Sequence, residues 1–275
     1  DTPQGKESVQ SIDTSLSGIH FFDWMHPRDI AYRAVAVALS DLAACGATPS
    51  WYMLSITINN VSHKWLNSFR EGLEDISEEY KIPLIGGDTT KGSLSVTVQV
   101  GGYVDVGKSI SRKGAKVGDL IFITGFIGEA AKELKYLKEK YKMLEARTSS
   151  YLRPKVRISV GEELREVASA AIDVSDGLIQ DLNHICDINE VGANVYLEDI
   201  PCSKEETIKA EFINEGDDYE ICFTAHLSVK QSIFQISQKL EVPITEIGKI
   251  IDGSGVNVIS RSGQQVNLKH GYKHF

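Results

Sequence analysis

Apolar residues recur along the first third of the chain with the spacings of alternating helices and strands. Residues 27–47 predict a helix, because Pro27 suits a first turn and an apolar stripe continues until Gly46. Residues 51–58 are typical of a buried strand. Ser62 is placed to cap a second helix, whose apolar residues also follow helical spacing. This part of the chain therefore predicts helices packed against a sheet.

Two more strands are predicted before the middle of the chain. Residues 82–85 form a short apolar run that enters a turn at Gly86, Gly87 and Asp88. Residues 93–104 alternate apolar and polar side chains, which predicts a half-exposed strand.

The second half of the chain is predicted to form a separate unit. The basic, glycine-containing stretch 107–118 marks the boundary, giving domains at residues 1–108 and 109–275. A strand at 120–124 and a helix through Lys140 follow. Further strands are predicted at 170–174, 193–197, 219–225, 243–250 and 256–260, and further helices at 155–169, 177–188, 204–212 and 228–240. The fold class is mixed α/β in two domains.

Composition narrows the class of partner. The formal net charge of −9 argues against nucleic acid or an anionic membrane. An acidic protein that handles phosphates is expected to use metal ions more than basic clusters. The four cysteines have no metal-ligand spacing and are interpreted as reduced thiols of a cytoplasmic protein. No apolar run approaches the ~20 residues of a membrane span, so no membrane partner is expected.

Five short acidic segments carry the candidate chemistry, because each sets an aspartate beside Gly, Ser or Thr. Mg²⁺ prefers one or two carboxylates per ion and shares its remaining positions with water and substrate phosphates. Carboxylates gathered from these segments therefore predict metal-dependent phosphoryl chemistry. The segments are 11–14, 40–43, 86–90, 173–177 and 215–220.

Each segment also has a simpler interpretation. Asp41 lies near the end of the first predicted helix, where the helix dipole disfavours an anion, and this favours a metal role over a surface charge. Asp88 alone is equally consistent with a hairpin turn. Asp176 is also placed as a helix cap, but a cap does not explain Asp173 at the end of an apolar strand. His20, taken alone, is interpreted as a half-buried imidazole.

Residues 102–109 match the phosphate-loop pattern G-x-x-x-x-G-K-[ST]. A phosphate loop leaves a strand and opens a helix, whereas Tyr103 and the two valines here continue an alternating strand. No helical stripe follows Lys108. The match is therefore predicted to be coincidental.

The order and spacing of these motifs resemble the thiamine-monophosphate kinase family, of the superfamily that includes aminoimidazole ribonucleotide synthetase. The resemblance covers essentially the whole chain and implies a two-domain fold of that superfamily, with N-terminal strands forming a barrel between two chains. It rests on D-T-S-L-S-G-I-H-F at 13–21, A-V-A-L-S-D-L-A-A-C-G-A at 36–47, I-G-G-D-T-T at 85–90, I-D-V-S-D-G-L at 172–178, E-G-D-D-Y-E at 215–220 and G-Y-K-H-F at 271–275.

The resemblance implies a role for individual positions. It implies catalytic roles for Asp88, Asp173 and Arg112. Nucleotide contacts fall to Gly87, Asp88, Arg112 and Ser175, and substrate contacts to His20, Asp217, Glu220 and Tyr272. The implied metal ligands are Ser11, Ile12, Asp13, Asp41, Asp88, Asp173 and Asp176.

The expected activity is Mg²⁺-dependent phosphorylation of thiamine monophosphate by ATP, with direct in-line transfer in a homodimer. Two departures from the family are visible. The family has a Gly-Asp-Asp motif upstream of the position of Asp13, and the sequence begins after it; Asp217 stands where the family usually has Glu. The alternatives are another ATP-dependent enzyme of the superfamily, or a non-catalytic nucleotide-binding protein if the upstream Asp pair is truly missing.

Overall fold

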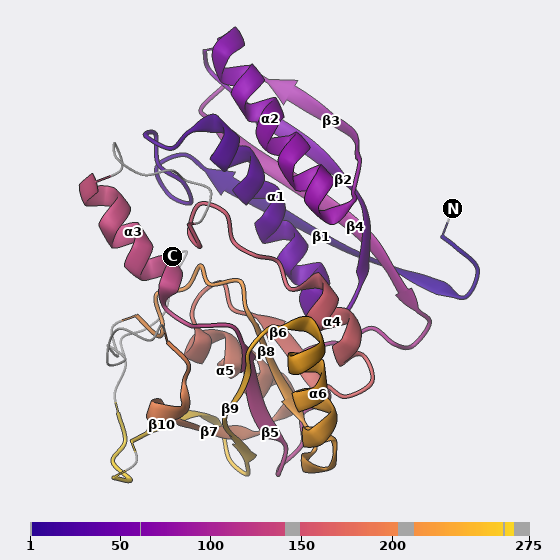
Figure 1. Ribbon diagram of the computed structural model, residues 1–275, viewed down its shortest axis with the longest axis vertical. Helices are drawn as coiled ribbons and strands as arrows, with labels where there is room; N and C mark the ends of the chain where they lie inside the picture. The colour runs from indigo at the N-terminus through magenta and orange to yellow at the C-terminus, as the bar shows by residue number, and fades with distance from the viewer. Residues whose placement is uncertain (1, 61, 141–148, 203–211, 261, 267–275) are drawn as a thin grey trace.

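The computed structural model describes residues 2–60, 62–140, 149–202, 212–260 and 262–266, and it places two sheets one above the other with helices around them (Figure 1). The mixed α/β class is confirmed. The described residues contain no helix that is long and apolar enough to cross a membrane.

The first sheet has four strands in the order β1-β4-β2-β3. Neighbouring strands are antiparallel except for the β2–β3 pair, which is parallel. The alternating pattern of β4 is confirmed, since Val96, Val98 and Val100 are all buried. Strand β1 was not predicted from the hydropathy pattern, because most of its residues are polar. The bounds are Lys6–Leu16 for β1, Thr48–Thr57 for β2, Leu84–Thr90 for β3 and Ser95–Asp105 for β4.

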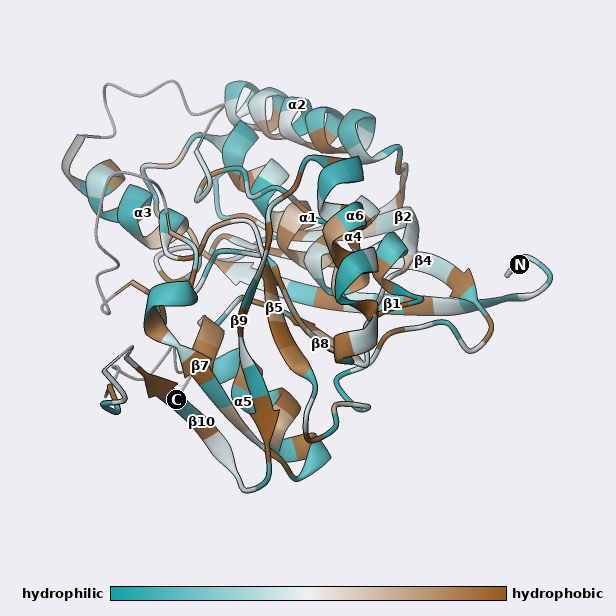
Figure 2. Cartoon of the chain, turned by 60° about the horizontal axis from the view of Figure 1, so that its bottom comes forward, coloured by the Kyte–Doolittle hydropathy of each residue, from teal (hydrophilic) through white to brown (hydrophobic). Residues whose placement is uncertain are grey.

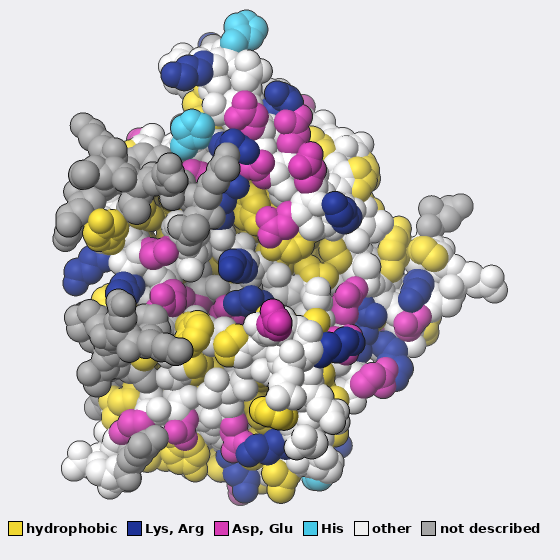
Figure 3. Space-filling view, in the orientation of Figure 1, with side chains coloured by type: hydrophobic (Ala, Val, Ile, Leu, Met, Phe, Trp, Pro, Cys, Tyr) yellow, Lys and Arg dark blue, Asp and Glu magenta, His cyan; other side chains and the backbone are white. Residues whose placement is uncertain are grey.

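Two helices cover one face of this sheet and leave the other open (Figure 1). Helix α1 (Pro27–Ala44) is buried along nearly its whole length between the two sheets. Helix α2 (His63–Tyr80) lies outside it and is capped by Ser62, as predicted, through a hydrogen bond from the Trp65 amide. Acidic side chains gather over the exposed face of α2 (Figure 3).

The predicted turn at Gly86, Gly87 and Asp88 is wrong. These residues lie inside strand β3, which pairs in parallel with β2 and places Gly87 opposite Leu54. A Cβ on Gly87 would lie 1.9 Å from the backbone oxygen of Leu54. Gly87 therefore allows close approach of the two strands, whereas a Cβ on Gly86 would meet only the Met53 side chain at 3.6 Å.

The second sheet has six strands in the order β10-β7-β9-β5-β8-β6. Most pairs are antiparallel, and only β10 and β7 run parallel. The bounds are Leu120–Thr124 for β5, Ala170–Asp173 for β6, Gly192–Tyr196 for β7, Ile221–Ala225 for β8, Ile244–Ile251 for β9 and Gly255–Ile259 for β10. Each strand predicted from the pattern in this half is present.

Alternation along the central strands divides the apolar side chains between two cores. In β5, Ile121 and Ile123 pack in a core with helix α5, whereas Phe122 joins the core formed around α1. Phe122 stacks on Phe223 of the neighbouring strand β8, with ring centroids 5.3 Å apart. Figure 2 shows the hydrophobic stretches of β5 and β8 next to each other. The core around α1 therefore contains side chains from both sheets.

The remaining helices are shorter than α1 and α2. They are α3 (Glu129–Lys140), α4 (Ile158–Leu164), α5 (Leu178–Asn189) and α6 (Lys230–Leu240), with 3₁₀ turns at Leu197–Asp199 and Leu227–Val229. Helix α4 covers only the middle of the predicted 155–169 segment. The helix predicted at 204–212 lies largely outside the described residues.

The stretch that matches a phosphate loop lies at the end of β4 and in the turn after it. Strand β4 continues to Asp105, and residues 106–119 contain turns and bends without a helix. Lys108 forms an exposed ion pair with Glu166 at 3.0 Å. The backbone lacks the helix that a phosphate loop opens, which supports the prediction that this motif is coincidental.

Candidate active site

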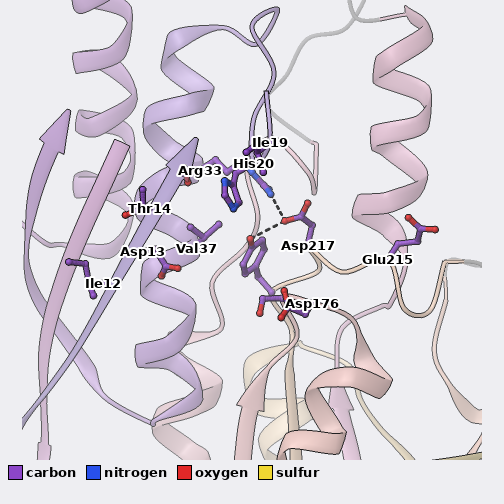
Figure 4. Close-up of a pocket in the computed structure, with 13 residues that line it drawn as sticks. Ile12, Asp13, Thr14, Ile19, His20, Arg33, Val37, Asp176, Glu215 and Asp217 are labelled. Atoms are coloured by element: carbon purple, nitrogen blue, oxygen red, sulfur yellow. Dashed lines mark hydrogen bonds and ion pairs between the residues drawn. The ribbon is translucent and has the colours of Figure 1, made fainter. Parts of the chain in front are cut away.

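A cavity of about 360 Å³ opens between the two sheets (Figure 4). Strand β1 and the loop after it form one wall, α1 forms the back, and the loops that follow β6 and precede β8 form the opposite wall. Its lining residues are Ile12, Asp13, Thr14, Ser15, Ile19, His20, Arg33, Val37, Ser175, Asp176, Glu215, Asp217 and Tyr219. Six residues predicted from the sequence thus share one cavity, namely Ile12, Asp13, His20, Ser175, Asp176 and Asp217.

Carboxylates from three elements lie close together at one side of this cavity. Ser11 and Asp13 lie on the face of β1 turned toward α1, and the Ser11 hydroxyl donates a hydrogen bond to Asp41 Oδ2 at 2.5 Å. Asp41 is in the last turn of α1, as predicted. Asp173 is the buried last residue of β6.

Their mutual influence is visible in their pKa values. Burial and the neighbouring Asp41 raise the pKa of Asp13 to about 6. The pKa of Asp173 is also raised well above its ordinary value, first by burial and then by Asp41. Both shifts mean that an additional negative charge is unfavourable here without a compensating cation.

The carboxylates beside the cavity fit a metal ion that also binds a phosphate ligand. Among the described residues, no group of three or more His, Cys, Asp or Glu side chains is arranged to hold an ion by protein ligands alone. However, Asp13, Asp41 and Asp173 supply hard oxygen donors, and Mg²⁺ takes one or two carboxylates and completes its shell with water and phosphate. The residues therefore fit a phosphate-bridged Mg²⁺ and do not form a closed protein cage.

The loop after β6 forms a second wall around Ser175 and Asp176. The backbone amides of Ser175, Asp176 and Gly177 all donate to Asp181 Oδ2, at 3.0, 3.0 and 3.1 Å. Asp181 comes from the first turn of α5 and occupies the position in which such amides commonly bind an anion. Because Asp181 occupies these amides, the nucleotide contact predicted for Ser175 would be made through its hydroxyl.

The acidic turn before β8 is held directly against this loop. The amide of Asp217 donates to the Ser175 carbonyl at 2.8 Å, and the amide of Tyr219 donates to Val174 at 2.8 Å. Asp217 and Tyr219 have φ values of +65° and +51°, a conformation that costs free energy for residues other than glycine. The two hydrogen bonds hold this backbone in place and bring Asp217 to the cavity.

Asp217 is paired with a buried arginine from the other side of the cavity. Arg33 of α1 forms an ion pair with Asp217 Oδ1, and the Tyr219 hydroxyl donates to the same oxygen at 3.0 Å (Figure 4). Arg33 is 5% exposed, and its guanidinium lies 4.3 Å from the centre of the Tyr151 ring. Burial lowers the pKa of Arg33, but Asp217 and the tyrosines outweigh burial and raise it overall.

His20 lies in the loop after β1, at the edge of the cavity. Its Nδ1 accepts a hydrogen bond from the Leu16 amide at 3.1 Å, so the neutral ring carries its proton on Nε2. The Tyr151 hydroxyl donates to the His20 carbonyl at 3.3 Å. The ring is thereby oriented by its own loop, and its predicted substrate contact is compatible with this position.

Glu220 lies apart from the cavity, and its carboxylate is bound by other side chains of the protein. Arg157 donates to it through Nε at 2.7 Å and through a second nitrogen at 2.5 Å, and Thr124 donates at 2.6 Å. The residue is 6% exposed and does not line the cavity. Its carboxylate joins β5, β8 and the segment before α4, and its predicted substrate contact stays a prediction.

Two predicted residues lie away from Asp13. Asp88 is on β3, and the pairings Asp13–Val98, Val98–Leu54 and Leu54–Gly87 separate this part of β3 from β1 by three strand spacings. At ~4.8 Å per spacing, this distance is about 14 Å. Gly87 lies beside Asp88. One chain therefore does not bring Asp88 to Asp13.

Arg112 is exposed and follows β4, outside the cavity lining. The positive charge of Arg112 still acts on the surroundings of Asp41 and Asp173. Burial, Asp41 and Asp173 raise the pKa of Cys45 to about 11, and Arg112 opposes them. Arg112 thus lies on the side of Asp41 and Asp173. The predicted contact of Tyr272 lies outside the described residues.

Known proteins match both halves of the chain. The family described as AIR synthase related protein matches through its N-terminal domain at residues 1–104 and through its C-terminal domain at residues 116–261. Thiamine-monophosphate kinase of Escherichia coli strain K12 is 40% identical over 287 residues, covering 99% of this chain and 88% of that protein. The chain belongs to the thiamine-monophosphate kinase family.

Solved structures of this family agree. Thiamine-monophosphate kinase from Stenotrophomonas maltophilia K279a superimposes with a TM-score of 0.87 at 36% identity, covering 96% of this chain and 87% of the other. The structure of AaThiL complexed with AMPPCP and TMP has a TM-score of 0.84 at 26% identity, covering 100% and 89%. The superfamily fold predicted from the sequence is confirmed.

Sequence reasoning missed several residues that shape this kinase-family site. Asp181 was not identified, and neither were Arg33 and Tyr151. Arg33 does carry a detectable signal, since it is a charged residue inside the apolar run of residues 30–39. A charge in such a run indicates a buried ion pair.

Proposed function

We propose that this chain transfers the γ-phosphoryl group of ATP to the phosphate of thiamine monophosphate, with Mg²⁺, and forms thiamine diphosphate. The observation that carries the proposal is the shared cavity, in which Asp13 and Ser175 lie with His20 and Asp217. Residues implied for the metal and nucleotide thus share one space with residues implied for the acceptor. The family relationship supports the same activity.

The chemistry requires little proton transfer from the protein. A phosphate monoester has a second pKa near ~6, so the attacking oxygen of thiamine monophosphate is already deprotonated at neutral pH. The main difficulty is to bring two anions together in line. The cavity accordingly needs to neutralise charge and fix geometry, and its residues need not act as a strong general base.

The acidic residues are assigned to this neutralisation. Asp13, Asp41, Asp173 and Asp176 would hold Mg²⁺ between the protein and the phosphates, and Ser11 and Ile12 lie beside them on β1. Mg²⁺ supplies charge neutralisation and in-line alignment of the phosphates. Ser11 orients the Asp41 carboxylate through its hydrogen bond. Ser175 is assigned to the nucleotide through its hydroxyl, and Arg112 is assigned to the transferred group.

The acceptor half of the cavity is assigned to thiamine monophosphate. Its thiazolium ring is cationic, and its aminopyrimidine ring has an amino group that can donate a hydrogen bond. The Asp217 carboxylate lines the cavity and suits either partner. His20 lies on the β1 side and is assigned to the same ligand. Tyr272 remains a predicted stacking residue.

A homodimer is proposed because one chain leaves part of the site and part of its first sheet incomplete. Every residue of the edge strand β3 is exposed, and the open face of the sheet presents Ile12 and Met53, which are 66% and 38% exposed. Two pairings of β3 with β1 of a second chain would close the two sheets into a barrel that encloses this face. They would also bring Asp88 and Gly87 of one chain toward Asp13 of the other.

The division into domains 1–108 and 109–275 remains a prediction, as does the cytoplasmic location. The two family matches leave residues 105–115 between them, and the predicted division falls inside this interval.

The function is tested by incubating the protein with ATP, Mg²⁺ and thiamine monophosphate and separating the products by chromatography. Thiamine diphosphate and ADP are expected in equal amounts. Free thiamine and an aminoimidazole-ribotide precursor are the control acceptors. Turnover of a control acceptor without turnover of thiamine monophosphate would assign the chain to another activity of the superfamily. ATP binding without turnover of any acceptor would support a non-catalytic nucleotide-binding protein.

A further inference from the structure

We infer that Arg33 is a positioning residue for the acceptor. It holds one oxygen of the Asp217 carboxylate, so that the second oxygen is presented to thiamine monophosphate in a fixed orientation. The inference rests on the proposed function, because it assigns the ligand of Asp217 to the acceptor. It adds a residue on α1 to the acceptor half of the site.

The hydrogen-bond pattern at Asp217 is asymmetric. Both Arg33 and the Tyr219 hydroxyl donate to Oδ1. Among the described residues, Oδ2 has no hydrogen-bond or ion-pair partner, and the Asp217 side chain is 33% exposed. Figure 4 shows both dashed lines meeting at one oxygen, with the other oxygen turned away from the two donors. Rotation of the carboxylate would break both contacts at once.

Arg33 is itself held in place, so it can determine the orientation of its partner. Its Nη1 donates to the Tyr151 carbonyl at 2.5 Å, and its Nη2 donates to Asp217. The guanidinium lies 4.3 Å from the Tyr151 ring centre and 5.5 Å from that of Tyr219. Two separate nitrogens of one planar group therefore join Tyr151 to Asp217. A lysine ammonium is a single point charge and does not reproduce this geometry.

The lengths of the Arg33 and Asp217 side chains together span the distance between their two backbones. Aspartate is shorter than glutamate by one methylene. Here the shorter acid meets arginine, the longest cationic side chain. Lengthening the acid or shortening the base alone should disturb the pair. Changing both together keeps the combined length, but lysine cannot also donate to the Tyr151 carbonyl, so the double variant is a partial rescue of the contact with residue 217.

The experiment compares steady-state kinetics for Arg33→Lys, Asp217→Glu and the double variant Arg33→Lys/Asp217→Glu. Each single variant is expected to raise the KM for thiamine monophosphate about tenfold, the effect of one charge-assisted hydrogen bond. The KM for ATP should change less than about twofold in the same variants. A general loss of structure would instead raise the KM values of both substrates. The double variant should recover part of the affinity for thiamine monophosphate that Arg33→Lys loses.

Arg28→Lys is the matched control, because Arg28 lies on the same helix and pairs with Asp75 at 2.7 Å. It is expected to leave both KM values unchanged. Thermal melting of every variant reports on folding. If Arg33→Lys fails to fold, Asp217→Glu and the double variant still test the matched lengths through direct binding of thiamine monophosphate by calorimetry.

Three outcomes separate the possibilities. A selective rise in the KM for thiamine monophosphate that the double variant partly reverses supports positioning by Arg33. Equal changes in both KM values, or no rescue in the double variant, would show that Arg33 only stabilises the fold and would overturn the inference. If the wild-type protein neither binds nor phosphorylates thiamine monophosphate, the proposed function itself fails, and with it the acceptor assignment.

Discussion

Ser11 Oγ lies 2.5 Å from Asp41 Oδ2, and this hydrogen bond joins the first strand to the last turn of α1. The strand period places Asp13 on the same face of β1 as Ser11. Asp13 is thereby brought to Asp41, although both are acids. The carboxylate of Asp41 also lies at the helix end where the dipole disfavours an anion. Protonation or a nearby cation relieves the repulsion between these acids.

The first prediction follows from this repulsion. Asp173→Asn should stabilise the protein in the absence of divalent ions, because it removes a buried charge that Asp41 disfavours. A rise in Tm of about 2–4 °C is expected for ~1 kcal/mol in a chain of this size. The same variant should lose turnover by about 100-fold or more, since it removes a proposed metal ligand. Calorimetry with and without Mg²⁺, combined with the product assay, measures both effects.

The control for this prediction is Asp252→Asn, an exposed aspartate in the turn between β9 and β10. It should change neither Tm nor turnover. A lower Tm for metal-free Asp173→Asn would contradict the idea that these carboxylates repel one another.

The second prediction concerns assembly. Met53→Lys places a charge on the open face of the first sheet, where we propose that two chains meet. The variant should be monomeric by light scattering and should lose most activity, because Asp88 of the partner would no longer reach the site. Ile188→Lys is the matched control, since Ile188 is 51% exposed on α5. A monomeric wild-type protein with full activity would exclude the shared site.

The residues that the sequence located correctly are those whose role depends on local pattern. Asp173 follows an apolar run, and the strand β6 ends there as predicted. The apolar stripe and the proline at residue 27 were sufficient to locate α1. Such features require only periodicity and the chemistry of neighbouring residues.

The sequence alone could not show which residue pairs with each charged side chain. Glu220 and Asp217 lie in one short acidic segment, yet Glu220 is bound by Arg157 and Asp217 by Arg33. Each pair joins residues far apart in the chain. The turn at Gly86 and Gly87 was wrongly predicted for the same reason, because the need for Gly87 comes from β2 and not from neighbours in sequence.

The third prediction tests the coincidental phosphate-loop motif. Lys108→Ala should leave the KM for ATP and the turnover within about twofold, because Lys108 forms only an exposed ion pair of small net value. Kinetics over a range of ATP concentrations provide the measurement. A large rise in the KM for ATP with unchanged melting would mean that the motif binds phosphate.

The last prediction concerns pH and uses Asp218, which lies beside the start of α3. Its carboxylate accepts hydrogen bonds from the Gly128 amide at 3.0 and 2.9 Å and from the Ala130 amide at 3.4 Å. Burial nevertheless raises the pKa of Asp218 to about 8, whereas in the unfolded chain an aspartate titrates near ~3.9. The folded state therefore favours the protonated acid. Its stabilising contribution is complete below pH ~4 and is lost as the pH rises toward 8.

Asp218→Asn carries no charge at any pH and keeps an oxygen for the Gly128 amide. The variant should therefore lose less stability than the wild type between pH 5 and pH 9. The difference in Tm between the two proteins should grow with pH and reach about a few degrees. Melting curves across this range measure the difference, with Asp252→Asn as the exposed control. Parallel curves for Asp218→Asn and the wild type would show that Asp218 is ionised throughout, with the two amides outweighing its burial.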